Sequence, residues 1–374
     1  MTRIGIVTLP LRINYGGILQ AYALQTVLER LGGQVSVIQT EHSGYPIPHG
    51  LNAFFIYVKR ALLKALGISD IPVRAEYVLN QQWPVVSANT RQFVEQHIHL
   101  KVVNSYDQLD STDYDVLVVG SDQVWRPLYS NLYQNYLQFA EHWDVKRVAY
   151  AASYGTNEKE YTSEQIDKCN PLIRRFNAVS VREDSGVILC KEYFGIQAQH
   201  VLDPTLLLGK EDYIRLIEDK GIGLSEGNLF VYLLDENEEK KVFVNRIVKE
   251  KNLTPFFVKA KSDYKYASVE DRIQPHVEKW LRAFMDAKFV ITDSFHGCVF
   301  SILFNKPFIA IGNSERGMAR FNSLLRMFNL EDRLVLDIRK QKSILDTSID
   351  WDKVNHILVC QRELAYSFIT NSIQ

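Results

Sequence analysis

The most regular feature of the first half of the chain is a set of short, nearly continuous apolar runs separated by longer amphipathic segments. Such runs are typical of parallel strands that are covered on both faces of a sheet. They lie at residues 4–8, 35–39, 115–120, 147–153, 178–182 and 199–203. Between the first two runs, the apolar residues of 17–31 recur at helical spacing, and the pair Gly32–Gly33 ends this predicted helix.

A second series of the same kind follows the polar segment 221–228. Its predicted strands and helices alternate at 229–234, 236–251, 255–259, 276–287, 288–292 and 307–311. The alternation predicts an α/β fold with two Rossmann-like domains, whose parallel sheets face each other across a cleft. We assign residues 1–210 to the first domain and 225–350 to the second. Residues 351–374 are predicted to form a C-terminal helix that packs back toward the first domain.

Residues 43–105 fit this alternation poorly. Within them, 51–68 has a helical pattern that gathers large apolar side chains on one face and adds positive charge. The apolar set is Leu51, Phe54, Phe55, Val58, Leu62 and Leu66, and the basic set is Lys59, Arg60 and Lys64. Two interpretations stay open: a helix docked on its domain, or an interfacial helix that contacts an anionic membrane surface through 51–66.

Composition narrows the class of protein. The 374 residues carry a formal net charge of -1, so the overall charge of the protein does not favour binding to a nucleic acid. No stretch of about 18 uninterrupted apolar residues is present, and the N-terminal sequence does not have the pattern of a signal peptide. The four cysteines are scattered without a C-x-x-C pair, which argues against a zinc or redox site. We therefore expect a cytoplasmic protein, at the inner face of the membrane if 51–66 contacts lipid.

The first candidate site follows the first predicted strand and reads RINYGGILQAYALQ (12–25). Asn14 can cap the helix, and Gly16 and Gly17 allow a ligand to approach the backbone near the positive end of the helix dipole. A tight strand-to-helix turn explains the same residues without a ligand.

The second candidate site, VVGSDQVWRP (118–127), places Ser121 and Asp122 at the carboxyl end of a parallel strand, where open α/β sheets bind ligands. Asp122 can act as a general base or as a helix N-cap. Trp125 is either a core residue or a stacking surface for a sugar ring.

The third candidate is Arg182, which directly follows a buried strand. Its planar fork suits a phosphate or a carboxylate, although an ion pair with Glu183, Asp184 or a neighbouring strand end is an alternative. Asp203, in VLDPTLLL, is predicted to cap the turn that precedes Pro204.

The fourth candidate is the turn ITDSFHG (291–297) of the second domain, with a helix predicted to begin at Gly297. Ser294, Phe295 and His296 then lie on the turn, where the helix N-terminus favours an anion. A structural role for this histidine stays open. Arg316 and Arg320 follow on the next loop and helix and can reach the same cleft.

Taken together, these motifs resemble the polysaccharide pyruvyltransferase family over roughly 300 residues. The resemblance is carried by NYGGILQAYALQ (14–25), VGSDQVW (119–125), SVRED (180–184), VLDPTLLL (201–208) and ITDSFHGCVFSILFNKPFIAI (291–311). It implies a GT-B-like arrangement, with the acceptor on the side of the first domain and the donor on the side of the second. Members of the family transfer a unit derived from phosphoenolpyruvate to a sugar, usually as a ketal that bridges two hydroxyls.

The chain departs from the family at one position. Many members carry Arg-Leu-His where this chain has Ser294-Phe295-His296, and that arginine and histidine are associated with the donor. His296 carries over and the arginine does not, so Arg320 or Arg316 is expected to supply the charge. Arg182 matches the family's arginine on the first-domain side.

The resemblance therefore implies an enzyme that binds phosphoenolpyruvate and a sugar or lipid-linked oligosaccharide acceptor. We expect Arg182, His296, Arg320 and the helix N-terminus at Gly297 to hold the donor, and Asp122 to act as the base. His296 can also donate a proton. No metal and no cofactor is required by this scheme. Two alternatives stay open: a glycosyltransferase that uses a nucleotide sugar on the same scaffold, and a non-catalytic protein that binds a ligand in the cleft.

Overall fold

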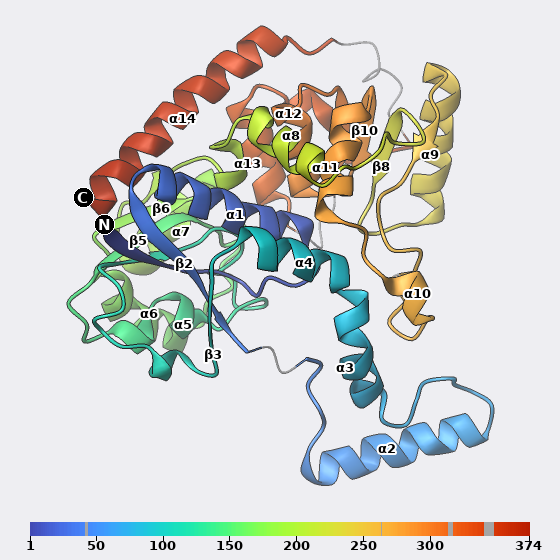
Figure 1. Cartoon of the computed structure of the whole chain (residues 1–374), viewed down its shortest axis with the longest axis horizontal. Coiled ribbons are helices and arrows are strands. Elements are labelled where there is room, and N and C mark those ends of the chain that lie inside the picture. The colour runs from blue at the N-terminus through green and yellow to red at the C-terminus, as the bar shows by residue number, and fades with distance from the viewer. Residues whose placement is uncertain (42–43, 263, 313–316, 340–347) are drawn as a thin grey trace.

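The computed structural model describes residues 1–41, 44–262, 264–312, 317–339 and 348–374 (Figure 1). Its first sheet has seven parallel strands in the order β3-β2-β1-β4-β5-β6-β7. The strands are β1 (Thr2–Val7), β2 (Gly33–Thr40), β3 (Leu100–Val103), β4 (Val116–Val119), β5 (Lys146–Ala152), β6 (Ala178–Val181) and β7 (Gln199–His200). The order changes direction between β1 and β4, which is where such a sheet opens a crevice for a ligand.

Alternate residues of the central strands pack into two different cores. Val116 and Val118 face one core, to which α1 (Tyr15–Arg30), α4 (Ala88–His97) and α8 (Lys210–Asp219) contribute. Leu117 and Val119 face the other core, which is covered by α5 (Leu132–Asn135), α6 (Ser163–Ile173) and α7 (Asp184–Phe194). Because both faces are covered, β4 is apolar at every position.

The second sheet has five parallel strands in the order β12-β11-β10-β8-β9. The strands are β8 (Leu229–Tyr232), β9 (Pro255–Phe256), β10 (Phe289–Thr292), β11 (Phe308–Ile311) and β12 (Leu334–Val335). Helix α9 (Glu238–Lys251) covers one face. The other face packs on α11 (Val277–Asp286), α12 (Phe295–Leu303) and α13 (Ala319–Met327), within the same core that holds α1.

One apolar core thus extends from the first sheet to the second and holds the two sheets together. Helix α14 (Trp351–Ile373) runs along the outside of both, and its C-terminus ends close to the N-terminus of the chain (Figure 1). Arg362 of α14 donates hydrogen bonds to the carbonyl groups of Leu206 and Leu208, at 2.5 and 2.6 Å. The predicted α/β class with two parallel sheets is confirmed.

The structure corrects the sequence prediction in the elements that depart from the alternating pattern. Strand β3 was missed because it lies at the edge of the sheet, and three of its four residues are exposed. Strand β12 was missed because it has only two residues. Helix α12 begins at Phe295 and not at Gly297. None of the described helices is long and apolar enough to cross a lipid bilayer.

Residues 44–99 form a helical excursion from the first sheet, with α2 (Gly50–Ala65), α3 (Ala75–Val86) and α4. Helix α3 packs against α10 (Val269–Arg272) of the second half of the chain. Asn89 donates a hydrogen bond of 2.7 Å to the carbonyl of Gln274. In Figure 1, α2 lies at the lower edge of the molecule, away from both sheets.

Candidate active site

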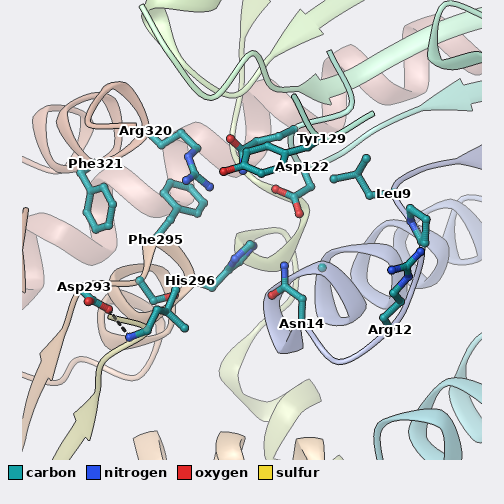
Figure 2. A pocket seen from close by; sticks show the side chains of 15 residues that line it. Leu9, Arg12, Asn14, Asp122, Tyr129, Asp293, Phe295, His296, Arg320 and Phe321 are labelled. Carbon is teal, nitrogen blue, oxygen red and sulfur yellow. Dashed lines mark hydrogen bonds between the residues drawn. The ribbon is translucent and has the colours of Figure 1, made fainter. Parts of the chain in front are cut away.

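A cavity of about 380 Å³ lies where the first sheet meets the α12 end of the second sheet. Figure 2 shows the side chains that line it, and they come from both halves of the chain. The polar and charged groups on its wall include Arg12, Asn14, Asp122, Asp293, His296 and Arg320. A pocket with convergent polar groups between two α/β units is the expected place for a small-molecule site.

The turn after β10 is held in place by Asp293 and Ser294. The Asp293 carboxylate accepts hydrogen bonds from the backbone N–H groups of Leu234 at 2.6 Å and Asp235 at 3.2 Å, and from Lys240 Nζ at 2.7 Å. Ser294 is the N-cap of α12, and its hydroxyl accepts a hydrogen bond from the Gly297 N–H at 3.4 Å. Both side chains thus connect parts of the protein, although they also reach the pocket wall.

The predicted anion site at the Gly297 N–H is wrong in its detail. Because α12 starts two residues earlier, this N–H already has the Ser294 hydroxyl as its partner. A Cβ atom at Gly297 would lie 2.2 Å from Thr292 Oγ1, so the glycine is needed for close packing of the turn. The first turn of α12 instead brings Phe295 and His296 to the pocket.

His296 is 6% exposed and lies against the start of α1. A Cβ atom at Gly16 would be 2.0 Å from His296 Nδ1, so the glycine makes room for the imidazole of the second half of the chain. We had expected Gly16 to admit a ligand, and this is corrected; Gly17 does line the pocket. His296 Nε2 lies 3.7 Å from Asp203 Oδ2 and makes no hydrogen bond within the described part of the chain.

Arg182 was predicted to present its guanidinium group to a ligand, but in the structure this group contacts carboxylates of the protein. Its Nη1 donates a hydrogen bond of 2.6 Å to Asp203, its Nη2 donates one of 3.2 Å to Asp122, and its Nε lies 3.7 Å from Glu183. The side chain is 1% exposed, and a buried guanidinium needs such partners. Burial opposes the charged form, but the three carboxylates outweigh it and raise the pKa of Arg182. Asp203 also caps the turn through Thr205, as expected.

Arg320 reaches the cavity from the second half of the chain. Its guanidinium lies 5.7 Å from the Phe295 ring, and Arg182 lies 4.5 Å from the same ring. Burial and the charge of Arg182 lower the pKa of Arg320 to about 10, against the attraction of Asp122 and Glu183. An anion in the pocket would therefore stabilise the charged form of Arg320. Arg316 lies outside the described residues.

Asp122 lies on the pocket wall with a left-handed backbone, at φ 68. Aspartate tolerates this conformation better than most residues. Burial tends to raise the pKa of Asp122, but Arg182, His296 and Arg320 together lower it below its usual value. The group is therefore a carboxylate at neutral pH in the free protein.

Two predicted site residues belong to the interior. Trp125 is fully buried, stacks on Tyr136 at a centroid distance of 5.0 Å and donates a hydrogen bond to the Asn135 carbonyl, so the prediction of a sugar platform is wrong. Ser121 is also fully buried, and its hydroxyl donates to the Ala151 carbonyl at 2.9 Å. It anchors the turn and does not line the cavity.

Asn14 occupies the N-cap position of α1, but its side chain makes no capping hydrogen bond and lines the cavity. Sequence reasoning missed Arg12 and Tyr129, which also line it. Arg12 stood in the first motif, two residues before Asn14, and that position was an available signal. Tyr129 lies in an irregular segment without periodicity, which left no signal.

Glu183 was weighed only as a partner of Arg182. Burial raises the pKa of Glu183 against the opposing charge of Arg182, and Ser153 Oγ donates a hydrogen bond to its carboxyl group. Within the described residues, no group of three or more His, Cys, Asp and Glu side chains could hold a metal ion.

A family model described as polysaccharide pyruvyl transferase matches residues 14–315, which is more than half of the chain. The comparison with curated proteins gave no match. Among solved structures, MurG of Acinetobacter baumannii aligns with 13% identity and a TM-score of 0.45, over 100% of this chain and 99% of its own. The UDP-GlcNAc 2-epimerase of Neisseria meningitidis, solved with UDP-GlcNAc, aligns with 8% identity and a TM-score of 0.48, over 98% of this chain and 94% of its own. Neither TM-score reaches 0.5, so these two structures add nothing to the fold described above.

Proposed function

The chain belongs to the polysaccharide pyruvyl transferase family, and we propose that it transfers a pyruvyl group from phosphoenolpyruvate to a sugar, with formation of a ketal. The acceptor is a polysaccharide or a lipid-linked precursor. The observation that supports this reaction is the cavity whose wall brings Arg320 and His296 together with the Asp122 carboxylate. The cavity thus contains cationic groups that can bind an anionic donor, and a carboxylate that can accept a proton.

The donor carries a phosphate and a carboxylate, and both need positively charged or N–H partners. Arg320 and His296 reach the cavity from the second half of the chain, and Arg12 and Asn14 reach it from the first. In the view of Figure 2, Arg320 and Arg12 lie on opposite sides of the cavity, with Asp122 between them. We assign Arg320 and His296 to the donor and place Arg320 in the role of the family arginine that Ser294 replaces. Arg182 supports the site indirectly, since it holds Asp122 and Asp203.

The chemistry requires protonation of the methylene carbon of the donor, which makes its C2 atom electrophilic. One sugar hydroxyl then attacks C2, phosphate leaves, and a second hydroxyl of the same acceptor closes the ketal. Each hydroxyl loses a proton, and Asp122 is our candidate to accept it. His296 is our candidate to bind the phosphate and to donate a proton. The scheme uses phosphoenolpyruvate as a substrate and requires no metal or cofactor.

The lowered pKa of Asp122 bears on this role. A carboxylate with a low pKa is a weak base, so the free protein is not optimally prepared for proton transfer. A bound anion would offset the positive charge of Arg320, and this would raise the pKa of Asp122 toward a more useful value. Donor binding would thus strengthen the base before the acceptor reacts.

The decisive experiment incubates the protein with phosphoenolpyruvate and a panel of sugar acceptors. We expect release of phosphate and a matching mass increase of one acceptor by a pyruvyl ketal. Arg320→Ala and His296→Ala should each strongly reduce this release, and Arg175→Ala, an exposed arginine that does not line the cavity, should not. Full phosphate release by both cavity variants would refute the assigned donor site.

The two alternatives predict different ligands. A glycosyltransferase would be stabilised by a UDP- or GDP-sugar in a thermal-shift panel and not by phosphoenolpyruvate. A non-catalytic protein would bind phosphoenolpyruvate without releasing phosphate with any acceptor. We place the reaction in the cytoplasm, and a lipid-linked acceptor would bring it to the inner face of the membrane.

A further inference from the structure

Helix α2 contributes no buried residue, although most of its residues are apolar. Figure 1 shows it at the lower edge of the molecule, connected to the two sheets through α3. An amphipathic helix on a globular protein normally packs its apolar face on the core, so an unburied apolar helix needs a different explanation.

The apolar face of α2 points away from the protein. Leu51, Phe54, Phe55, Val58 and Leu62 recur at helical spacing and are 79%, 61%, 66%, 40% and 59% exposed. Leu66 and Ile68 continue this surface just beyond the helix, at 71% and 68% exposure. The seven residues form one surface, which we call the α2 apolar face.

The opposite side of the helix makes the contacts with the protein. Arg60 donates two hydrogen bonds to the Glu76 carboxylate, at 2.8 and 2.9 Å, and a third to the Val73 carbonyl at 3.3 Å. At about 100° per residue, Arg60 lies about 120° and 140° around the helix axis from Phe54 and Phe55, and about 180° from Leu51. The protein therefore contacts α2 on the side of Arg60, where Ala53, Ile56, Tyr57 and Leu63 are also partly buried, and it leaves the face with Phe54 and Phe55 exposed.

The charge of the segment is opposite in sign to that of the chain. Residues 44–74 contain the basic residues Lys59, Arg60, Lys64 and Arg74 and the single acidic residue Asp70, whereas the whole chain has a formal net charge of -1. Within α2, basic residues are present and acidic residues are absent. Positive charge beside an exposed aromatic and aliphatic face matches a membrane surface with anionic lipids.

We propose that α2 lies in the surface of a membrane that contains anionic lipids, with the α2 apolar face inserted among the lipid chains. A second copy of the chain is a poorer match, because two such segments would bring positive charge against positive charge. The proposal rests on α2 and its surroundings, and it stands or fails independently of the pyruvyl transfer.

The test is flotation of the full chain with lipid vesicles of two compositions, phosphatidylcholine alone and phosphatidylcholine with phosphatidylglycerol. We expect flotation with the anionic vesicles and a decrease as the salt concentration rises. The double variant Lys59→Gln, Lys64→Gln should weaken the binding by about tenfold or more, since each basic side chain near an anionic surface adds to the attraction.

The sharper test is the double variant Phe54→Ser, Phe55→Ser, which should lose most of the flotation. Its matched control is Leu224→Ser, Val242→Ser, where the two side chains are 79% and 68% exposed in other parts of the molecule. Because all four side chains are exposed, both variants should keep the melting temperature of the unchanged protein. Phosphate release without vesicles serves as a second check that the fold and the cavity are intact.

Three results would overturn the proposal. Flotation that persists in the phenylalanine variant would show that another surface binds lipid. Equal flotation with neutral and anionic vesicles would remove the role of charge. A self-association that depends on Phe54 and Phe55, without flotation, would assign the α2 apolar face to a second copy of the chain.

Discussion

Two turns at the cavity each place an aspartate after a buried strand, and the protein uses the two carboxylates differently. Asp293, after β10, accepts three hydrogen bonds, from two backbone N–H groups and from Lys240. Asp122, after β4, accepts one side-chain hydrogen bond from the residues that the structure describes, given by Arg182, and faces the cavity. The position of an acidic residue at a strand end therefore does not decide its role. Its role depends on how many hydrogen-bond donors of the protein already contact the carboxylate.

The largest expected effect is on catalysis. Asp122→Asn keeps the shape of the side chain but removes the carboxylate, and loss of a general base typically costs about 10² to 10⁴ in rate. We expect phosphate release to fall by about this factor, while calorimetry shows that phosphoenolpyruvate still binds. Loss of donor binding in this variant would mean that Asp122 supports the structure of the site and does not accept a proton.

The next effect is on stability and concerns the other aspartate. Asp293→Ala leaves the buried Lys240 ammonium without its carboxylate, and breaking a buried ion pair in this way costs about 3–5 kcal/mol of unfolding free energy. Denaturant titration measures this loss. Phosphate release per folded molecule should fall much less than in Asp122→Asn.

A double variant provides the control for this prediction. Asp293→Ala combined with Lys240→Met removes both charges, so it should be less destabilised than the sum of the two single variants. If the free energies simply add, Asp293 does not stabilise the turn through Lys240.

A smaller effect tests the contact between the two halves of the chain. Gly16→Ala places a Cβ atom 2.0 Å from His296 Nδ1, so the ring or the start of α1 must move. Overpacking of this kind costs about 1–3 kcal/mol. Gly17→Ala is the matched control, since its Cβ atom would lie 3.3 Å from Asn14 Nδ2, where a small shift suffices. We expect the unfolding free energy to fall in Gly16→Ala, and an equal loss of unfolding free energy in Gly17→Ala would contradict the contact.

The smallest effect is on the pH dependence of stability. The pKa values of Asp122 and Asp203 are lower in the folded protein than the ordinary value of 3.8, so the folded state binds fewer protons than the unfolded state in this range. Their stabilising contribution is therefore present above about pH 4 and is lost as the pH falls through the folded pKa values. Asp122→Asn should flatten the acid limb of the stability curve, and an unchanged limb would show that Asp122 contributes little to it.

Much of the fold could be predicted because it depends on local patterns. The strands from β4 to β6 are nearly continuous apolar runs, and the helix after β1 has clear periodicity, so local patterns in the sequence predict both. Local patterns do not reveal strands β3 and β12, because β3 is mostly exposed and β12 has only two residues. The motif positions of Asp122, His296 and Arg320 also pointed to a shared cavity, since strand ends of parallel sheets meet at one edge.

Helix α2 is a second case in which the sequence pattern alone leaves the arrangement undecided. The sequence predicts that 51–66 is an amphipathic helix with basic residues, but it leaves two arrangements open. Only the position of Arg60 against Glu76 shows which side of the helix the protein contacts. The apolar face is consequently the exposed one, which the periodicity alone does not reveal.

The amino-acid order thus determined the α/β class, the succession of most strands and helices, and the motifs that identify the family, because these depend on local spacing and residue type. The tertiary structure decided which charges are available to a ligand. Arg182 is bound by Asp122 and Asp203, Trp125 is part of the core, and His296 fills the space above Gly16. These outcomes depend on contacts between distant segments and on burial, which forces each buried charge to find a partner before any substrate arrives.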